Sequence, residues 1–543
     1  MENFTVVIFI MAILIALSAI ADKSKLPYPV LLVVVGLVIG FIPALPDLSM
    51  DPDVVFLIFL PPLLYDAASK TSWHELRTSI RPISALAFTL VIFTTLAVAV
   101  CAHYLIPGFT WPLSFLLGAI VSPPDAVAAT SITKGLGLNK KVITILEGES
   151  LLNDASALIA YRYAIVAVTT GSFILWQAAL QFFLVAGGGI LIGIASGYLF
   201  VFAHKKIYNN AIVETSLTLL SPFIAYLLAE HFHVSGILAV VSAGLIISWR
   251  APEIFSYHVR MRSRVVWDSL IFLLNGFIFI LIGLQLPSII KDLGDYPFMK
   301  LLGNGLLISL ATIVVRIIWV FAGAYWQNVF SSAKTVVVTG EDVNDSDTWK
   351  NVLIVAWTGT RGIISLAAAL ALPLTMENGD AFPKRHSIIF LAFIVIFVTL
   401  VVQGLSLPLL IRFLRVKPER NQEREEKELK LYLAINTLHY IDHDFPISLE
   451  SKLKEQLKRK YETLVNNLTK EIRADKKRRI NDESIQAPVT PLLNAQVEVS
   501  RFQRDLLIKL HKEGTFSDDA LRHVELERDV DDLKLDMQLP REE

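Results

Sequence analysis

The 543-residue chain has almost no cysteine and almost no net charge. Its single cysteine, Cys101, excludes an intrachain disulfide framework and a site built from several cysteines. The 49 lysines and arginines nearly balance the 50 aspartates and glutamates, so the overall charge suggests no nucleic-acid partner. The sequence also lacks the phosphate-binding motif Gly-x4-Gly-Lys-[Ser/Thr] and the hydrolase motif Gly-x-Ser-x-Gly. These absences argue against an ATP-driven pump and an enzyme, and we expect no cofactor.

Long apolar runs are what the sequence has in abundance. Hydrophobic residues make up 54% of the chain, and runs near 20 residues long recur from the N-terminus to about residue 413. A helix needs about 20 apolar residues to cross a bilayer. The sequence therefore predicts an all-α polytopic membrane protein with about thirteen transmembrane helices, near residues 3–20, 27–44, 53–69, 83–105, 113–131, 146–169, 177–203, 212–230, 234–249, 265–287, 302–326, 352–373 and 387–413.

Lysines and arginines are distributed unevenly over the predicted loops. The odd-numbered loops hold sixteen of them and the even-numbered loops hold four. Because basic loops stay in the cytoplasm, the odd-numbered loops are predicted to be cytoplasmic. With thirteen spans, the N-terminus lies outside the cell membrane and the C-terminus inside. The first run lacks the basic residues that precede the apolar core of a signal peptide, so we expect a retained helix.

The composition changes abruptly after Arg415. Residues 416–543 contain 24 of the 49 basic and 27 of the 50 acidic residues. Leu431, Ile435 and Leu438 recur among these charges at helical spacing. We therefore expect a transmembrane domain, residues 1–415, and a cytoplasmic helical tail, residues 416–543. The composition of this tail fits regulation and simple stabilisation equally well.

Several ionisable residues fall within or beside the apolar runs. An ionised side chain at the centre of a membrane helix costs about 2.5–3.5 kcal/mol on insertion scales. Such residues usually face the interior of a helix bundle or a water-filled cavity. The candidates are Asp66, Asp125, Glu149, Asp154, Arg162, Arg316 and Arg361.

The segment LEGESLLNDASALIAYR, residues 146–162, carries three of these charges. Ser150 and Asp154 are four residues apart and share one helical face, while Glu149 and Asn153 share the adjacent strip. A carboxylate and a hydroxyl are hard oxygen ligands suited to a small alkali cation such as Na⁺. Burial favours the neutral form of a carboxyl group, so Asp154 is suited to exchange a proton for a cation. A structural ion pair is the alternative interpretation of this aspartate.

The fifth predicted span is interrupted by SPPD, residues 122–125. Pro123 and Pro124 lack a backbone N–H, which leaves the carbonyls of Ala119 and Ile120 without helical donors. Broken helices at membrane depth occur where protein or a water-lined site covers the freed groups. Asp125 follows directly and is suited to neutralise the N-terminus of a half-helix. A simple proline kink is the alternative, but the carboxylate at the break favours a functional site.

The twelfth predicted span has a matching interruption. Gly359 and Gly362 flank Arg361 in the motif GTRG; glycines allow unwinding, and an arginine offsets the dipoles of half-helix C-termini. If spans 1–6 and 8–13 form inverted repeats, the interrupted spans 5 and 12 occupy corresponding positions. Paired interrupted helices of this kind are typical of the substrate site of a transporter.

Two further charges are weaker indicators. Arg316 lies deep in the eleventh span and needs an acidic partner, for which Glu149 is the obvious candidate. Asp66 lies late in the third span, in FLPPLLYDAASK. It either lines an entry funnel for the ion or merely ends the helix.

A stripe of small residues runs along the seventh span. Gly189, Gly193 and Gly197 recur at intervals of four residues. Such a stripe usually indicates close packing of two helices. A dimer interface is the alternative.

Together these motifs resemble the bacterial sodium/proton antiporters of the first monovalent cation:proton antiporter family, the NhaP/NHE-like group. GESLLNDA resembles that family's Glu-Ser-x-x-Asn-Asp signature, and FLPPLLYDAA and GTRG resemble its motifs in the third and twelfth spans. The resemblance covers essentially the whole membrane part. Many relatives carry Asp followed by Pro at the fifth-span break, whereas Pro123 and Pro124 precede Asp125 here. A backbone carbonyl ligand is expected near Pro124.

The resemblance implies a fold and a set of residue roles. The family has a dimerisation domain and a moving core with two crossed, unwound helices, and its members are homodimers that work by elevator-like alternating access. It implies that Asp154 carries the cation and the proton. The ion- and proton-binding residues that it implies are Asp154, Ser150, Asn153, Asp125 and Asp66. The structural, charge-compensating residues are Glu149, which pairs with Arg316, and Arg361.

These expectations combine into a sodium/proton antiporter of the cell membrane that serves pH and sodium homeostasis. Protonation of Asp154 expels the cation and cation binding expels the proton, because only a neutralised site crosses the hydrophobic barrier readily. The Asn-Asp pair implies electroneutral exchange. The alternatives are potassium/proton exchange by the same machinery and, more remotely, an ion channel. The expected partners are Na⁺, or K⁺ or Li⁺, with H⁺, membrane lipid and a second copy of the chain.

Overall fold

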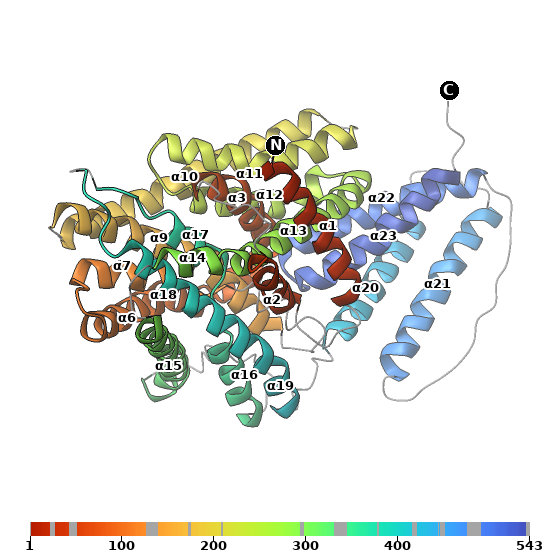
Figure 1. Cartoon of the computed structure of the whole chain (residues 1–543). Coiled ribbons are helices and arrows are strands. Elements are labelled where there is room, and N and C mark those ends of the chain that lie inside the picture. The colour runs from red at the N-terminus through yellow and green to blue at the C-terminus, as the bar shows by residue number, and fades with distance from the viewer. Residues whose placement is uncertain are drawn as a thin grey trace. The chain divides into compact units, whose positions relative to one another are not determined.

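The computed structural model describes residues 2–21, 28–42, 52–125, 140–171, 175–207, 210–293, 298–330, 345–376, 379–414, 421–443, 445, 451–474 and 490–538. The described residues are mostly helical, and their β-structure is limited to one isolated bridge between Thr375 and Ala381. The all-α class predicted from the apolar runs is confirmed. Figure 1 labels the helices along the chain. The chain divides into two compact units: residues 1–203, 216–249 and 266–418 form the first, and residues 204–215, 250–265 and 419–543 form the second.

The apolar helices agree with the predicted spans. Eight helices of the described residues are long and apolar enough to cross a membrane, and shorter apolar helices occupy residues 8–17, 28–40 and 111–121. Each of the thirteen predicted spans overlaps a helix, and the number of crossings stays a prediction. The helices up to residue 170 are α1 (Glu2–Ala21), α2 (Tyr28–Gly40), α3 (Pro52–Lys70), α4 (Trp73–Thr78), α5 (Ile80–Ser84), α6 (Val91–Leu105), α7 (Trp111–Val121) and α9 (Lys140–Thr170). Those that follow are α10 (Leu175–Lys206), α11 (Ala211–His231), α12 (Gly236–Ile254), α13 (Tyr257–Leu284), α14 (Leu286–Asp292), α15 (Phe298–Phe330), α16 (Asp345–Trp357), α17 (Ile363–Leu370), α18 (Arg385–Val398) and α19 (Gly404–Leu414).

Both predicted helix interruptions are present. Helix α7 ends at Val121, and residues 122–125 continue without helical structure. The rest of the predicted fifth span, residues 126–131, lies outside the described residues. Helix α16 ends at Trp357 and α17 begins at Ile363, so residues 358–362 are unwound. Proline and glycine therefore end these helices where the sequence places them.

Two π-helical turns, which the sequence analysis did not predict, lie inside otherwise continuous helices. The first, η1 (Ala85–Leu90), joins α5 to α6, and the second, η2 (Thr399–Gln403), joins α18 to α19. A π-helical turn displaces backbone hydrogen bonds from their α-helical partners and often marks a functional site.

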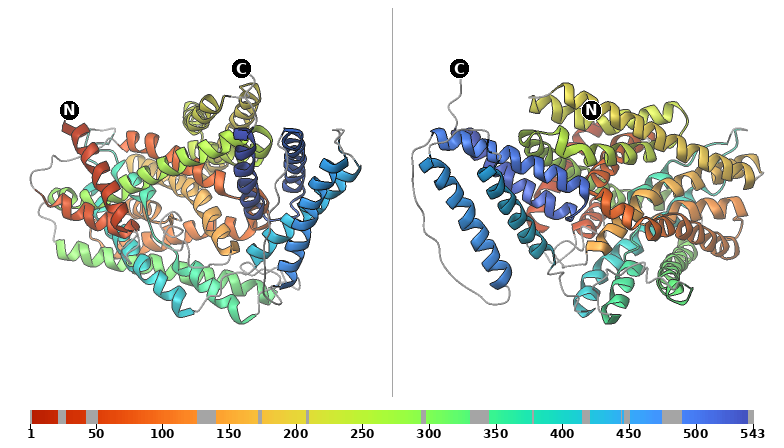
Figure 2. Two further views of the ribbon diagram at one scale, coloured as in Figure 1. Left: turned by 90° about the vertical axis from the view of Figure 1, so that its right-hand side faces the viewer. Right: turned by 180° about the vertical axis from the view of Figure 1, so that it is seen from behind.

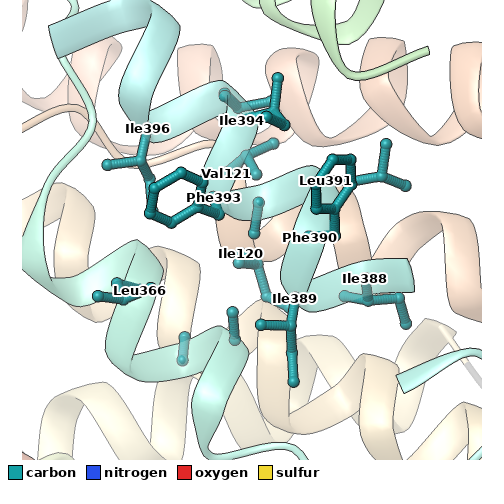
Figure 3. Packing of buried hydrophobic residues seen from close by; sticks show 14 of the residues in the cluster. Ile120, Val121, Leu366, Ile388, Ile389, Phe390, Leu391, Phe393, Ile394 and Ile396 are labelled. Atoms are coloured by element: carbon teal, nitrogen blue, oxygen red, sulfur yellow. The ribbon is translucent and has the colours of Figure 1, made fainter. Parts of the chain in front are cut away.

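The largest apolar core of the first unit packs around the two interruptions. Helix α18 is buried from Ser387 to Ile396 and lies beside α7, α15 and α17. Figure 3 shows Ile120 and Val121, at the end of α7, among the isoleucine and phenylalanine side chains of α18. This core packs apolar side chains of α18 against the helices that adjoin the two interruptions.

The glycine stripe of α10 packs against α12. A Cβ at Gly193 would lie 2.7 Å from Ser242 Cβ, and one at Gly197 would lie 3.2 Å from Ala243 Cα. Gly189 approaches Ser235 in the same way. The predicted close helix packing is therefore confirmed, and its partner is a helix of the same chain.

The second unit contains the C-terminal helices α20 (Asn421–His443), α21 (Ser451–Ala474), α22 (Thr490–Glu513) and α23 (Asp518–Gln538). Helices α20 and α21 lie side by side (Figure 2). Leucines from α20, α22 and α23, among them Leu429, Leu510 and Leu521, form an apolar core. The unit also includes residues 204–215 and 250–265, which connect apolar helices. The predicted division at residue 415 stays a prediction.

Buried charges bind α23 to the start of α13 within the second unit. Arg260 Nε donates to Asp529 Oδ2 at 2.9 Å, and the same guanidinium lies 3.3 Å from Glu525. Asp529 is 2% exposed. Lys512 of α22 lies 2.8 Å from Glu253 at the end of α12. The C-terminal helices are therefore joined by ion pairs to connections between apolar helices.

Candidate ion-binding site

Helix α9 carries the central group of polar side chains. Asn153 and Asp154 are buried, and Ser150 is half-buried one turn earlier. Asn153 Nδ2 donates to the carbonyl of Pro124 at 3.0 Å. Its Oδ1 is buried and has no hydrogen-bond partner among the described residues. The segment therefore presents a carboxylate, an amide oxygen and a hydroxyl from one helix, and the amide ties that helix to the first interruption.

The two interruptions are bonded to each other. The backbone N–H of Asp125 donates to Thr360 O at 2.7 Å, and Thr360 Oγ1 donates to Asp125 O at 3.1 Å. A Cβ added at Gly362 would overlap the Asp125 carboxylate. Gly362 is the N-cap of α17, so the carboxylate lies where the helix dipole favours a negative charge. Asp125 is also close enough to Asp154 to interact with it electrostatically.

The Arg361 side chain donates hydrogen bonds to backbone carbonyls at both interruptions. Its Nε donates to Val121 O, the last residue of α7, at 3.0 Å, and Nη1 donates to Gly359 O. Its backbone N–H donates to Thr399 Oγ1 in η2 at 3.1 Å. The side chain is 1% exposed. A cation at half-helix C-termini offsets their partial negative charge, as the sequence analysis proposed.

Arg316 and Glu149 form a buried ion pair. The two guanidinium nitrogens of Arg316 donate to the two carboxylate oxygens of Glu149 at 2.5 and 2.8 Å. Arg316 also donates to Val355 O near the end of α16. Both residues are 1% exposed. This is the partner that the sequence analysis expected, and the bidentate geometry links α9 to α15 and α16.

Gly359 lies between the two buried arginines. A Cβ at this position would lie 2.6 Å from Arg316 Cδ and 3.0 Å from Arg361 Nη1. Only glycine leaves space for both side chains at this point of the unwound segment. The glycine therefore allows the backbone to pass between the arginines, in addition to allowing the helix to unwind.

Ser156 connects the α9 segment to the first π-helical turn. Its Oγ is placed to donate to Ala87 O in η1 at 2.6 Å and to Asn153 O at 2.8 Å. Ser156 is buried, two residues after Asp154. The hydroxyl thus bonds a carbonyl of η1 and fixes α9 beside it.

Asp66 has its contacts at the end of α3. Lys70 Nζ lies 2.9 Å from Asp66 Oδ2 and 3.3 Å from Asp268 Oδ1. Asp66 is 7% exposed, whereas Lys70 is exposed. The Asp66 carboxylate pairs with Lys70 of its own helix, so its role in ion binding rests on the motif resemblance alone. Arg162, to which the sequence analysis gave no role, pairs with Glu230 at 3.1 Å.

Sequence reasoning missed Ser156, Thr360 and Thr399. Serine and threonine are common in membrane helices and often bond their own backbone, so residue type alone does not distinguish these three. Their bonds to Ala87, Asp125 and Arg361 join segments 38 to 235 residues apart. The one available signal was the position of Thr360 inside GTRG.

Comparison with known proteins gives a consistent result. Residues 8–413 match the family described as "Sodium/hydrogen exchanger, transmembrane". The chain is 32% identical over 450 residues to the "Sodium, potassium, lithium and rubidium/H(+) antiporter" of Bacillus pumilus, a match that covers 81% of this chain and 64% of that protein. It is 31% identical to the Na(+)/H(+) antiporter NhaH of Halobacillus aidingensis, covering 75% of this chain and 96% of that one. The fold is similar to that of the sodium proton antiporter MjNhaP1 from Methanocaldococcus jannaschii, with a TM-score of 0.56 and 22% identity over 77% of this chain and 100% of that chain. The matched region thus spans less than two thirds of the Bacillus pumilus protein.

Proposed function

Because the chain belongs to the sodium/hydrogen exchanger family of multi-pass membrane proteins, we propose that it is a secondary antiporter that exchanges cytoplasmic Na⁺ for external H⁺. Asp154 is the group that both ions share. Asn153 and Ser150 supply further oxygen ligands, and Asp125 lies beside them. The observation that carries this proposal is a buried carboxylate on a helix that is bonded to one of two unwound segments, which are themselves hydrogen-bonded to each other.

The charges of five candidate-site residues support an exchange of one cation for one proton. Glu149, Asp125 and Asp154 carry three negative charges when ionised, and Arg316 and Arg361 carry two positive charges. The group therefore has a net charge of −1 until Asp154 binds either a proton or a monovalent cation. An uncompensated charge is costly inside a membrane, so the neutral forms are the ones that move across it. Competition for one carboxylate then couples the two ions without a separate gate.

We extend the proposal to orientation and assembly on the resemblance to the family and on the distribution of basic loops. The N-terminus is external, the C-terminal helices are cytoplasmic and the protein works in the cell membrane. Alternating access is elevator-like and the protein is a homodimer. The physiological role is control of cytoplasmic pH and sodium.

Potassium/proton exchange is the second candidate. The relative from Bacillus pumilus is named for sodium, potassium, lithium and rubidium, and oxygen ligands of the Asp154 type do not by themselves distinguish these ions. Cavity size and the number of ligands decide the preference. Adding each cation separately in the same flux assay distinguishes the two candidates.

The direct test is proton flux in proteoliposomes that contain the purified protein. Adding Na⁺ on one side should move protons in the opposite direction, with saturation and without uncoupled current. A channel would conduct Na⁺ without counter-movement of protons. Absence of cation-dependent proton movement with Na⁺, Li⁺ and K⁺ would rule out the proposed function.

A further inference from the structure

A polar stripe runs along the helix that contains η2. Thr399, Gln403 and Ser406 are four and three residues apart, so they lie on one face of that helix. Thr399 Oγ1 accepts from the Arg361 N–H at 3.1 Å, and Ser406 Oγ accepts from Trp357 Nε1 at 2.8 Å. The two outer members of the stripe therefore contact the two ends of the unwound segment between α16 and α17.

Gln403, between them, is fully buried and unbonded at both ends of its amide. Its exposed fraction is 0%, and neither Oε1 nor Nε2 has a hydrogen-bond partner among the described residues. A buried carboxamide has up to four hydrogen-bonding positions, and leaving them unfilled is costly. Thr399 and Ser406, which flank Gln403 on the same helix, bond Arg361 and Trp357, on either side of residues 358–360. This is the part of the chain where unwinding has displaced backbone hydrogen bonds.

We propose that Gln403 binds an ordered water molecule against the unwound segment of residues 358–360. Breaks in membrane helices are tolerated where side chains and ordered waters bond the freed backbone. Arg361 and Asp125 already bond the carbonyls of Gly359 and Thr360, and the water bound by Gln403 completes this set. The inference deepens the proposed antiport function and rests on it only for its effect on transport.

Water fits this position better than the transported cation does. A carboxamide presents an N–H donor as well as an oxygen, and a metal ion satisfies only the oxygen. The charged residue bonded to the same stripe is Arg361, which repels a cation. A water molecule can donate a hydrogen bond to Oε1 and can accept one from Nε2, so water suits both polar atoms of the amide.

The structural test compares high-resolution maps of the protein in Na⁺ and in Tl⁺, a heavy monovalent cation. A peak within hydrogen-bond distance of Gln403 that is equal in both maps supports a water. A peak that gains the scattering of Tl⁺ overturns the proposal, because it identifies a cation. Absence of a peak, with the amide bonded to a protein group, overturns it as well. This test does not depend on antiport, so it holds even if the proposed function fails.

The functional test uses Gln403→Leu, which keeps the volume and removes the amide. Loss of one water-mediated contact at the break should lower the maximal exchange rate about tenfold. The cation concentration for half-maximal rate should change less than about threefold, because Asp154 and its neighbours set it. Gln403→Asn, which keeps an amide, should recover part of the rate.

Gln181→Leu is the control, since it makes the same change at an exposed position of α10, where the amide oxygen already accepts from Tyr163. It should stay within about twofold of the unchanged protein. Folding is checked by thermal unfolding in detergent. A folded Gln403→Leu variant with an unchanged rate, or with its main effect on half-saturation, would overturn the proposed role.

Discussion

At the scale of single residues, Asn153 and Asp154 are neighbours that are held in different ways. Asn153 is bonded to the Pro124 carbonyl, so its position follows the first interruption. Asp154 is buried beside the charge of Asp125. An aspartate in such a place is stabilised when a proton or a cation neutralises it. In the proposed mechanism the amide and the carboxylate therefore differ in role: Asn153 holds the helix and Asp154 binds the ion.

Replacing Asp154 by Asn tests this division. Asparagine has nearly the same shape but neither binds a proton nor supplies a negative charge for a cation. Asp154→Asn should therefore abolish sodium-dependent proton flux while leaving expression and thermal unfolding near those of the unchanged protein. Flux in proteoliposomes is the measurement. Persistent sodium-driven proton movement in the variant would remove Asp154 from the mechanism.

The Glu149–Arg316 pair is expected to matter for stability. Glu149→Ala leaves the Arg316 guanidinium buried without its carboxylate, which should cost about 3–5 kcal/mol. The expected result is a clear drop in the temperature of thermal unfolding in detergent. Glu149→Leu combined with Arg316→Met should recover much of the loss, because no buried charge remains. A Glu149→Ala variant that unfolds at the original temperature would show that the pair is not structural.

Residue type and position predicted the Glu149–Arg316 pair. A buried, charged arginine is costly inside the membrane unless a carboxylate lies at the same depth. The same reasoning did not extend to Thr360 or Ser156. Their hydroxyls satisfy backbone groups that become available only after the helices have unwound or adopted a π-turn. Such partners depend on the packed fold, and one sequence without that fold does not identify them.

At the scale of elements, apolar length and helix breakers predicted the apolar helices of the described residues and both interruptions, while the number of membrane crossings stays a prediction. Proline at residues 123–124 and glycine at residues 359 and 362 act on their own backbone, so their effect is local. The π-helical turns η1 and η2 had no such signal. Both turns contain residue types that are common in α-helices. In η1 the Ala87 carbonyl bonds Ser156 of α9, and in η2 the Thr399 hydroxyl bonds the backbone of Arg361.

The contact between α10 and α12 supplies a matched pair of substitutions. Gly193→Ala puts a methyl group 2.8 Å from Ala239 Cα, so the helices must separate. Overpacking of this kind should destabilise the protein by about 1–3 kcal/mol. Gly187→Ala, on the same helix, meets no described atom within 4 Å and should be neutral or slightly stabilising. Thermal unfolding of both variants is the measurement, and equal unfolding temperatures would contradict the close packing.

At the scale of the whole molecule, the buried charge balance predicts transport that does not respond to voltage. Moving one net charge across 100 mV changes the free energy by about 2.3 kcal/mol. Exchange of one Na⁺ for one H⁺ moves no net charge, so clamping the vesicle potential at either sign should leave the flux unchanged. The measurement is sodium-driven proton flux at potentials set by gradients of a permeant anion such as thiocyanate, because K⁺ is itself a candidate substrate. A flux that rises at one sign and falls at the other would contradict the count of buried charges.

The sequence did not predict which segments of the chain make up the second unit. Charge density separated the C-terminal helices from the apolar region, but the contact between Arg260 and Asp529 joins residues 269 apart. Arg260 was counted only as a loop cation that sets orientation. Nothing in its neighbourhood along the chain indicates that a distant aspartate neutralises it.

That contact has a consequence for shortened versions of the chain. Ending the chain at Leu414 would strip Arg260 of both acidic neighbours and leave Glu253 without Lys512. The Arg260 guanidinium would lose these carboxylates while it still bonds the Phe255 carbonyl. Truncation would thus disturb the turn between α12 and α13 as well as remove the final helices. Altered transport after such a cut would not, by itself, reveal a regulatory domain.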